Sequence, residues 1–167
     1  VDGMLSRSTD ALLAFPPLLL AIVITAAFGA GFRTAIIAIA ITYVPLMLRV
    51  TRGLTLVERE RTYVDELSCQ GFSALRICLW HILPNIRRGI AAQATISFGY
   101  ALIDLAALAF LGLGVQPPTA DWGAMLSEGR QSLLINATEV TSAAILIALT
   151  VTAFNVLGDA LSSGGRR

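Results

Sequence analysis

Four stretches of this chain carry almost no charge and approach the length of about 20 residues that a helix needs to cross a bilayer. Residues 11–32 alone contain no charged side chain over 22 positions. No stretch shows the alternation of polar and apolar residues that is typical of a half-buried strand. The sequence therefore predicts an all-α membrane protein, a single domain over residues 1–167, with about four transmembrane helices near 11–32, 34–57, 89–114 and 140–160.

The composition supports a location in a membrane. Only 14% of the residues are charged and 56% are hydrophobic, whereas a typical soluble domain has about 25% charged residues. The formal net charge is +1 at pH 7, which leaves no sizeable basic excess to neutralise phosphates. We expect contact with membrane lipid and no nucleic-acid partner.

Prolines interrupt the first two expected spans. Pro16 and Pro17 lie inside the first uncharged run, so the helix is expected to kink or to begin there. Pro45 is expected to bend the second span, whose two arginines can snorkel to the interface and let the helix continue to about residue 57.

The distribution of arginine predicts the orientation. Residues 49–88 hold seven arginines, whereas residues 115–138 hold one. Basic residues near membrane ends favour the cytoplasm. The loop 58–88 is therefore expected on the cytoplasmic side and the loop 115–138 outside, in a multi-pass protein of the cytoplasmic membrane.

The loop 58–88, called the middle segment below, reads as two short helices. In the first, apolar residues form one edge at Tyr63, Val64 and Leu67. Gly71 follows, and glycine commonly ends helices because it adopts left-handed backbone angles without steric cost. Ser73 offers an oxygen to cap a second helix.

The second short helix has an apolar face at roughly helical spacing. Its members are Phe72, Leu75, Leu79 and Ile82. Pro84 is expected to break this helix or to mark the entry to the third span. By periodicity alone, a surface helix resting on the bilayer is as good an interpretation as a docking element.

The sequence YVDELSCQGFSALRICLWHILPN, residues 63–85, resembles the EAA loop of binding-protein-dependent ABC importer permeases. In that family a Glu-Ala-Ala start, a Gly and a downstream His-x-Leu-Pro recur at this spacing. The stretches LLAFPPLLLAI, PLMLRVTRG, FLGLGVQPPTADWGAML and LTVTAFNVLGDAL are similar to the dipeptide, oligopeptide and nickel branch. They look most like its second, C-type permease subunit.

The resemblance implies part of a six-helix permease fold in which the EAA loop forms a coupling helix that docks on an ATPase. It implies a heterodimer with a second permease, two ATPase subunits or domains, and an extracytoplasmic substrate-binding protein. The residues that it assigns to ATPase coupling are Tyr63, Asp65, Glu66, Gly71, His81, Leu83 and Pro84.

Two departures from the family pattern are visible. Where the family has Glu-Ala-Ala, this chain has Asp65, Glu66 and Leu67, which replaces small residues with larger ones. Family members usually have six spans, so this chain is expected to lack the N-terminal ones.

Cofactors, metals and catalysis are not expected. Cys69 and Cys78 lie nine residues apart without a CxxC spacing or a histidine cluster, so we expect free thiols and no metal site. The chain has no Gly-x-x-x-x-Gly-Lys-Ser/Thr motif and no lysine. Any ATP hydrolysis would therefore lie in partner subunits, and the lone His81 is expected to pack at the foot of the third span.

Asp104 interrupts the third span, and an ionisable residue within a membrane is a functional candidate by default. It can line a translocation path and meet the amino group of a peptide, it can pair with an arginine of a partner subunit, or it can lie near the outer interface. Trp122 in the outer loop is either an interface anchor or part of a re-entrant loop near the docking surface of the binding protein.

The sequence thus predicts a permease subunit of an ABC importer that moves peptides, or a related small solute such as nickel, into the cell. One alternative is a non-functional remnant of such a permease. Another is a secondary transporter or channel, which should have more charges within its spans and an inverted repeat.

Overall fold

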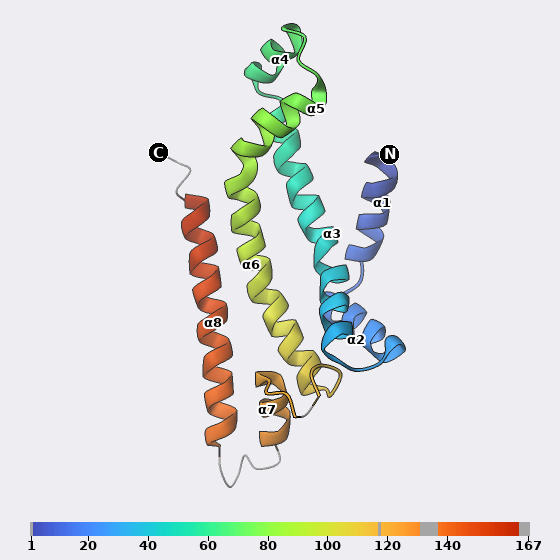
Figure 1. Cartoon of the computed structure of the whole chain (residues 1–167), viewed down its shortest axis with the longest axis vertical. Coiled ribbons are helices and arrows are strands. Elements are labelled where there is room, and N and C mark those ends of the chain that lie inside the picture. The colour runs from blue at the N-terminus through green and yellow to red at the C-terminus, as the bar shows by residue number, and fades with distance from the viewer. Residues whose placement is uncertain (1, 117, 131–136, 164–167) are drawn as a thin grey trace.

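The computed structural model describes residues 2–116, 118–130 and 137–163, and for residues 2–6 and 8 it describes the backbone alone. Within these ranges the chain is built from helices and contains no strand (Figure 1). The all-α membrane class is confirmed. In chain order the helices are α1 (Asp2–Leu13), α2 (Pro17–Phe28), α3 (Phe32–Arg59), α4 (Thr62–Cys69), α5 (Ala74–Ile77), a π-helical turn (Cys78–Ile82), α6 (Leu83–Phe110), α7 (Trp122–Gly129) and α8 (Thr138–Ser163).

Three long helices form the body of the molecule. Among the described residues, three helices are long and apolar enough to cross a membrane: α3, α8 and the continuous helix Ala74–Phe110 that contains α6. With 28 residues each, α3 and α6 are about 42 Å long, which exceeds the roughly 30 Å of a hydrocarbon core. In Figure 1 α6 lies between α3 and α8.

The expected span 11–32 is not one helix in the structure. Its first residues belong to the end of α1, and α2 is only 12 residues long, or about 18 Å. The break lies at Pro16, whose extended backbone (φ −57°, ψ 129°) is followed by Pro17 as the first residue of α2. Proline fits the first turn of a helix but not its interior, so the two prolines begin a new helix rather than kink a continuous one.

Small residues bring the long helices together. A Cβ atom on Gly158 of α8 would lie 2.8 Å from Cγ1 of Ile96 and 3.1 Å from the carbonyl oxygen of Ala92 on α6. On the other side of α6, a buried cluster is made by Ala21, Ala35, Ala38 and Leu108. Small residues at helix contacts are typical of membrane proteins, where packing rather than the hydrophobic effect drives association.

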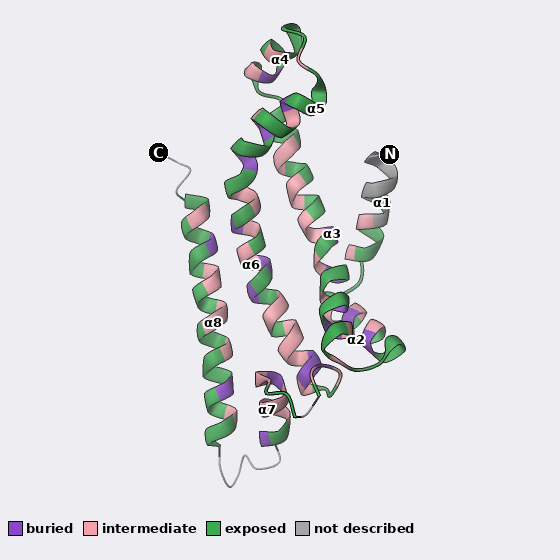
Figure 2. Cartoon of the chain, viewed as in Figure 1, coloured by how far each residue is buried: buried purple, intermediate pink, exposed green. Residues whose placement is uncertain are grey.

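The outer surface of the helices is largely apolar. Large hydrophobic side chains on α2, α3 and α8 are exposed, including Val23, Ile37 and Leu149, and Figure 2 shows exposed positions along most of α8. A soluble monomer rarely exposes apolar patches of this extent. The surface fits contact with lipid or with other membrane helices.

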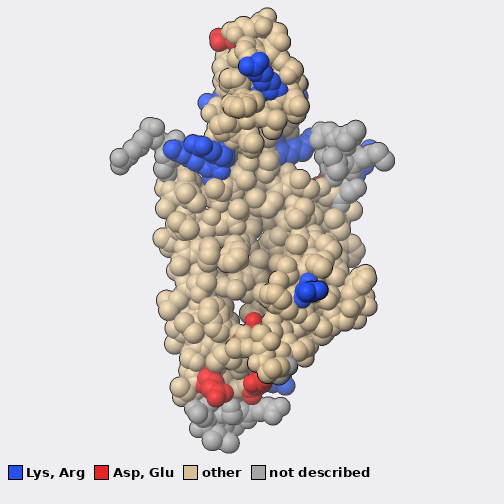
Figure 3. All heavy atoms as spheres, in the orientation of Figure 1, with Lys and Arg blue, Asp and Glu red and all other residues tan. Residues whose placement is uncertain are grey.

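Basic side chains gather towards one end of the molecule. Figure 3 shows most of the visible basic side chains near the end formed by the middle segment, whereas acidic side chains are visible at both ends. The gathering of basic side chains at this end agrees with the cytoplasmic orientation that the arginine distribution predicts for the middle segment.

Candidate functional site

The middle segment includes the last residues of α3 and the first residues of α6, and its remaining part, residues 60–82, lies beyond these two helices at one end of the molecule (Figure 1). It has its own apolar cluster, in which Val64, Ile77, Ile82 and Ile86 are buried. Partly buried neighbours complete it: Leu54, Tyr63, Leu67, Phe72 and Ile90. The segment is therefore packed on the helices that precede and follow it rather than extended as a loop.

The apolar edge of α4 faces this cluster. Val64 is 7% exposed, and Tyr63 and Leu67 are partly buried against the same core. Asp65 and Glu66 lie on the exposed side of α4. The structure thus divides the predicted coupling residues of α4 into an inward group and an outward acidic pair.

Gly71 ends α4 in the left-handed conformation that the sequence predicts, with φ of 83°. The amide N–H of Phe72 donates to the carbonyl of Leu67, and the amide of Gly71 donates to the carbonyl of Ser68. These two bonds form a Schellman motif. A Cβ at Gly71 would meet nothing within 4 Å, so backbone conformation, and not lack of space, requires glycine here.

The second short helix begins where Ser73 predicts it. The Ser73 hydroxyl accepts a hydrogen bond from the Arg76 amide at 3.4 Å. The Arg76 guanidinium lies over the Phe72 ring, 4.8 Å from its centroid. His81 meets the same ring edge-on, with 6.3 Å between the centroids, so His81 packs within the middle segment at the start of the third long helix.

Pro84 does not break the chain into separate helices. The preceding residues form a π-helical turn, in which the Leu83 amide donates to the carbonyl of Cys78, five residues earlier. Proline inside a regular helix loses a hydrogen bond and clashes with the carbonyl four residues before it. The wider turn accompanies the proline, and residues 74–110 run on as one helix.

The π-helical turn also changes which residues are buried. The expected apolar face included Leu75 and Leu79, but these are 70% and 50% exposed. The buried residues are Ile77, Ile82 and Ile86, at spacings of five and four. A π turn closes five residues apart, so the pattern read at 3.6 residues per turn is right for Phe72 and Ile82, which pack in the cluster, and wrong for Leu75 and Leu79.

Leu83 and Pro84 are exposed at the start of α6. They line a shallow, mostly apolar groove together with Arg87, Ile90 and Ala91. Neither residue contributes to the buried cluster of the middle segment.

Glu58 and Asn85, which the sequence analysis did not single out, connect α4 to α3 and α6. Glu58, in the last turn of α3, is only 7% exposed. Its Oε1 accepts hydrogen bonds from the Tyr63 hydroxyl at 2.9 Å and from Asn85 Nδ2 at 3.0 Å. Its Oε2 lies 2.9 Å from Nε of Arg61. Burial raises the pKa of the Tyr63 phenol above its ordinary value of 10.0.

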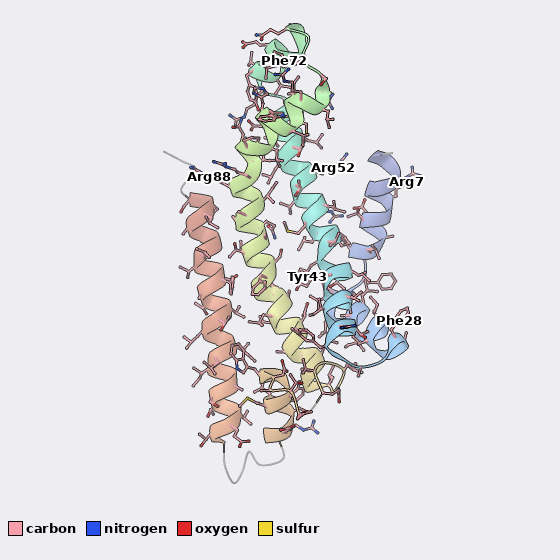
Figure 4. All side chains as sticks on the ribbon, in the orientation of Figure 1. Arg7, Phe28, Tyr43, Arg52, Phe72 and Arg88 are labelled. Carbon is pink, nitrogen blue, oxygen red and sulfur yellow. The ribbon has the colours of Figure 1, made fainter. Side chains whose placement is uncertain are left out.

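Asp104 makes a pair within the chain. The Tyr43 hydroxyl of α3 donates to Asp104 Oδ2 at 2.8 Å, and Tyr43 is labelled in Figure 4. Both side chains are partly buried. The Asp104 carboxylate thus has a hydrogen-bond partner within the chain.

Polar side chains continue along the same helix. Counting from Asp104 towards the middle segment, Tyr100, Ser97 and Gln93 occur at intervals of three or four residues, which places them on one face of α6. Gln93 donates to Ser97 at 3.2 Å. This face therefore carries a polar stripe through a membrane-spanning helix.

At the opposite end, α7 folds back against the ends of the long helices. A Cβ on Gly123 would lie 2.4 Å from the carbonyl oxygen of Ala106 in α6, and one on Gly129 would lie 2.3 Å from Cγ2 of Val140 in α8. Asp121 caps α7 by accepting from the Ala124 amide at 3.0 Å. Trp122 is half-buried in this packed turn.

The two cysteines are free thiols, with Cys69 exposed on α4 and Cys78 partly buried. Among the described residues no group of three or more His, Cys, Asp or Glu side chains is placed to hold a metal ion.

Comparison with known proteins places the chain among membrane transport components. Residues 1–163 match the family model described as "Binding-protein-dependent transport system inner membrane component". The chain is 44% identical over 160 residues to the glutathione transport system permease protein GsiD of Shigella flexneri serotype 5b and to that of Escherichia coli O6:K15:H31. The match covers 96% of this chain and 53% of each relative, so the chain spans about half the length of the curated relatives it matches.

Proposed function

The chain belongs to the family of binding-protein-dependent transport system inner membrane components, and from this premise we propose that it serves as a permease subunit of an ABC importer. The family match over residues 1–163 is the observation that carries the proposal. The helices, the apolar outer surface and the arginine distribution support a multi-pass protein of the cytoplasmic membrane.

In this proposal the middle segment couples the permease to an ATPase. Asp65 and Glu66 form the outward face that an ATPase subunit contacts. Gly71 sets the turn between the two short helices, and Tyr63 supports α4 from within.

The remaining predicted coupling residues connect the contact to the membrane. His81 packs on Phe72, while Leu83 and Pro84 begin α6 after the π-helical turn. ATP hydrolysis itself takes place in the partner subunits, and a second permease and an extracytoplasmic binding protein complete the importer.

The solute is proposed to be a peptide-type compound. The relatives named above are glutathione transport permeases by their names, and glutathione is a small peptide. Asp104 offers a carboxylate to the ammonium group of such a solute, with the Tyr43 hydroxyl beside it. A charged hydrogen bond of this kind contributes about 1.5–3 kcal/mol. Nickel is the other solute class of the branch that the sequence resembles.

The proposal is tested with the native membrane complex, purified through a tag on this chain and reconstituted into vesicles with its binding protein. We expect ATPase subunits and a second permease to co-purify. We expect uptake of labelled glutathione or another short peptide only when ATP is supplied to the cytoplasmic side.

Three results would contradict the proposal. Uptake driven by an ion gradient without ATP would indicate a secondary transporter or channel. Co-purification without any uptake of peptides or nickel would indicate a remnant that only binds partners. Uptake by vesicles that contain this chain alone would contradict the need for partners.

A further inference from the structure

Glu58 is an unusual acidic residue for the cytoplasmic end of a membrane helix, because its carboxylate is buried. The side chain is 9% exposed, whereas that of its partner Arg61 is 63% exposed. A buried carboxylate is costly unless it is paired and hydrogen-bonded. The local structure must therefore supply donors to it.

The donors to Glu58 come from three successive parts of the chain. Arg61 belongs to the turn after α3, Tyr63 to α4 and Asn85 to the first turn of α6. Asn85 Nδ2 also lies 3.2 Å from the Tyr63 hydroxyl, to which it donates. Asn85 and Glu58 are 27 residues apart in the sequence. The Glu58 carboxylate thus connects the end of α3, the start of α4 and the start of α6.

An apolar layer lies beside this polar junction. Leu54 of α3 packs closely against Gly89 of α6. A Cβ atom on Gly89 would lie 3.0 Å from Cδ1 of Leu54. Ile86, one residue after Asn85, is buried in the same cluster as Val64 of α4. Apolar contacts of this kind hold surfaces together but are non-directional, whereas the hydrogen bonds fix the angle between α4 and the two long helices.

We propose that Glu58 is a positioning residue that joins α4, the end of α3 and the start of α6 into one rigid unit. The inference rests on the proposed function, because it concerns how motion of an ATPase reaches the membrane helices. A displacement of α4 then moves α3 and α6 together. Without the junction, α4 keeps its chain connections and its apolar contacts, so a partner still binds it, but the displacement is not passed on to α6.

The test uses the assembled importer in vesicles with its binding protein, ATP and labelled glutathione. Asn85→Ala removes the link to α6 while Arg61 and Tyr63 still satisfy the carboxylate. Glu58→Gln removes the charge. Glu60→Gln is the matched control, since Glu60 lies two residues from Glu58 and is exposed. The measured quantities are the amount of assembled complex, the basal ATPase rate and the uptake per ATP hydrolysed.

We expect both Asn85→Ala and Glu58→Gln to leave assembly and the basal ATPase rate close to wild type. We expect uptake per ATP to fall about tenfold, which corresponds to the loss of a hydrogen bond to a charged group. Glu60→Gln should behave as wild type in all three measurements.

Two outcomes would overturn the inference while the wild-type complex still transports. Unchanged uptake per ATP in both variants would show that the junction only stabilises the fold. Loss of assembly in Asn85→Ala, with Glu60→Gln assembled, would show that the junction is needed for folding or docking rather than for transmission. Absence of ATP-dependent uptake by the wild type would instead contradict the proposed function, and the inference would fall with it.

Discussion

Two carboxylates of this chain, Glu58 and Asp104, lie in different surroundings. Glu58 accepts from three donors, on Arg61, Tyr63 and Asn85. Among the residues that the structure describes, one side chain donates a hydrogen bond to Asp104, through the Tyr43 hydroxyl. An ionised carboxylate has about four acceptor sites.

The difference fits the two proposed roles, Glu58 as a positioning residue and Asp104 as a solute contact. The acceptor capacity of Glu58 is nearly filled, so the group is suited to hold helices in a fixed arrangement. Asp104 retains capacity for a ligand and lies on the polar stripe of α6. We therefore expect substitutions at the Glu58 end to change coupling, and substitutions at the Asp104 end to change solute affinity.

The largest effect is expected from Asp104→Asn. Asparagine keeps an oxygen that accepts from Tyr43 but lacks the charge that is proposed to bind an ammonium group of the solute. Loss of about 1.5–3 kcal/mol raises the KM for uptake of a peptide about 10–100-fold. Uptake kinetics of the reconstituted complex measure this change.

The control for Asp104→Asn is Asp159→Asn, since Asp159 is an exposed acid on α8. An N-acetylated peptide, which has no ammonium group, should show no difference between wild type and Asp104→Asn. An unchanged KM for the free peptide would rule out Asp104 as a solute contact.

Gly71→Val tests the region around Glu58, where substitutions are expected to change coupling. Forcing a residue with a side chain into the left-handed region costs roughly 1–2 kcal/mol, and a β-branched residue costs more. We expect α4 to tilt, and uptake per ATP and substrate-stimulated ATPase activity to fall about 5–30-fold, with little change in KM.

Gly71→Asn is the matched control, because asparagine tolerates the left-handed conformation. It should retain most of the coupling, provided that equal assembly of both complexes is first verified. Normal uptake and normal stimulation in Gly71→Val would mean that the turn is not needed for coupling.

The smallest effects are expected from two matched tyrosine variants, Tyr43→Phe and Tyr63→Phe. Each removes one hydroxyl that donates to a carboxylate, a bond worth about 1.5 kcal/mol at the lower end of the range for charged groups, or roughly a tenfold change. Tyr43→Phe should change KM, and Tyr63→Phe should change uptake per ATP. Equal effects of the two variants on both quantities would remove the distinction between the two carboxylates.

Local features of the middle segment were predictable from sequence because neighbouring residues determine them. Gly71 ends α4 through backbone conformation, and Ser73 caps the next helix through an adjacent amide. Both signals depend on residues within a few positions. The long apolar helices were predictable as well, because long stretches of nearly uncharged residues mark them in the sequence.

The junction at Glu58 was not predictable in the same way. In the sequence Glu58 is followed by other charged residues, and its partner Asn85 lies 27 residues away. No neighbouring residue therefore indicates that either side chain is buried or paired. Because of the π-helical turn, a pattern read at 3.6 residues per turn misplaced part of the buried face. The two prolines were compatible with either a kinked helix or a new helix. Each of these depends on how distant segments pack.

The central claim, that the exposed face of α4 is cytoplasmic and covered by an ATPase, is tested most directly through Cys69. This thiol is exposed on α4, and a Cys78→Ser background leaves it as the chain's single cysteine. We expect a membrane-impermeant maleimide to label it in inside-out vesicles stripped of ATPase subunits, and to be blocked when those subunits are rebound. Labelling in intact cells, or equal labelling with and without the rebound subunits, would contradict the claim.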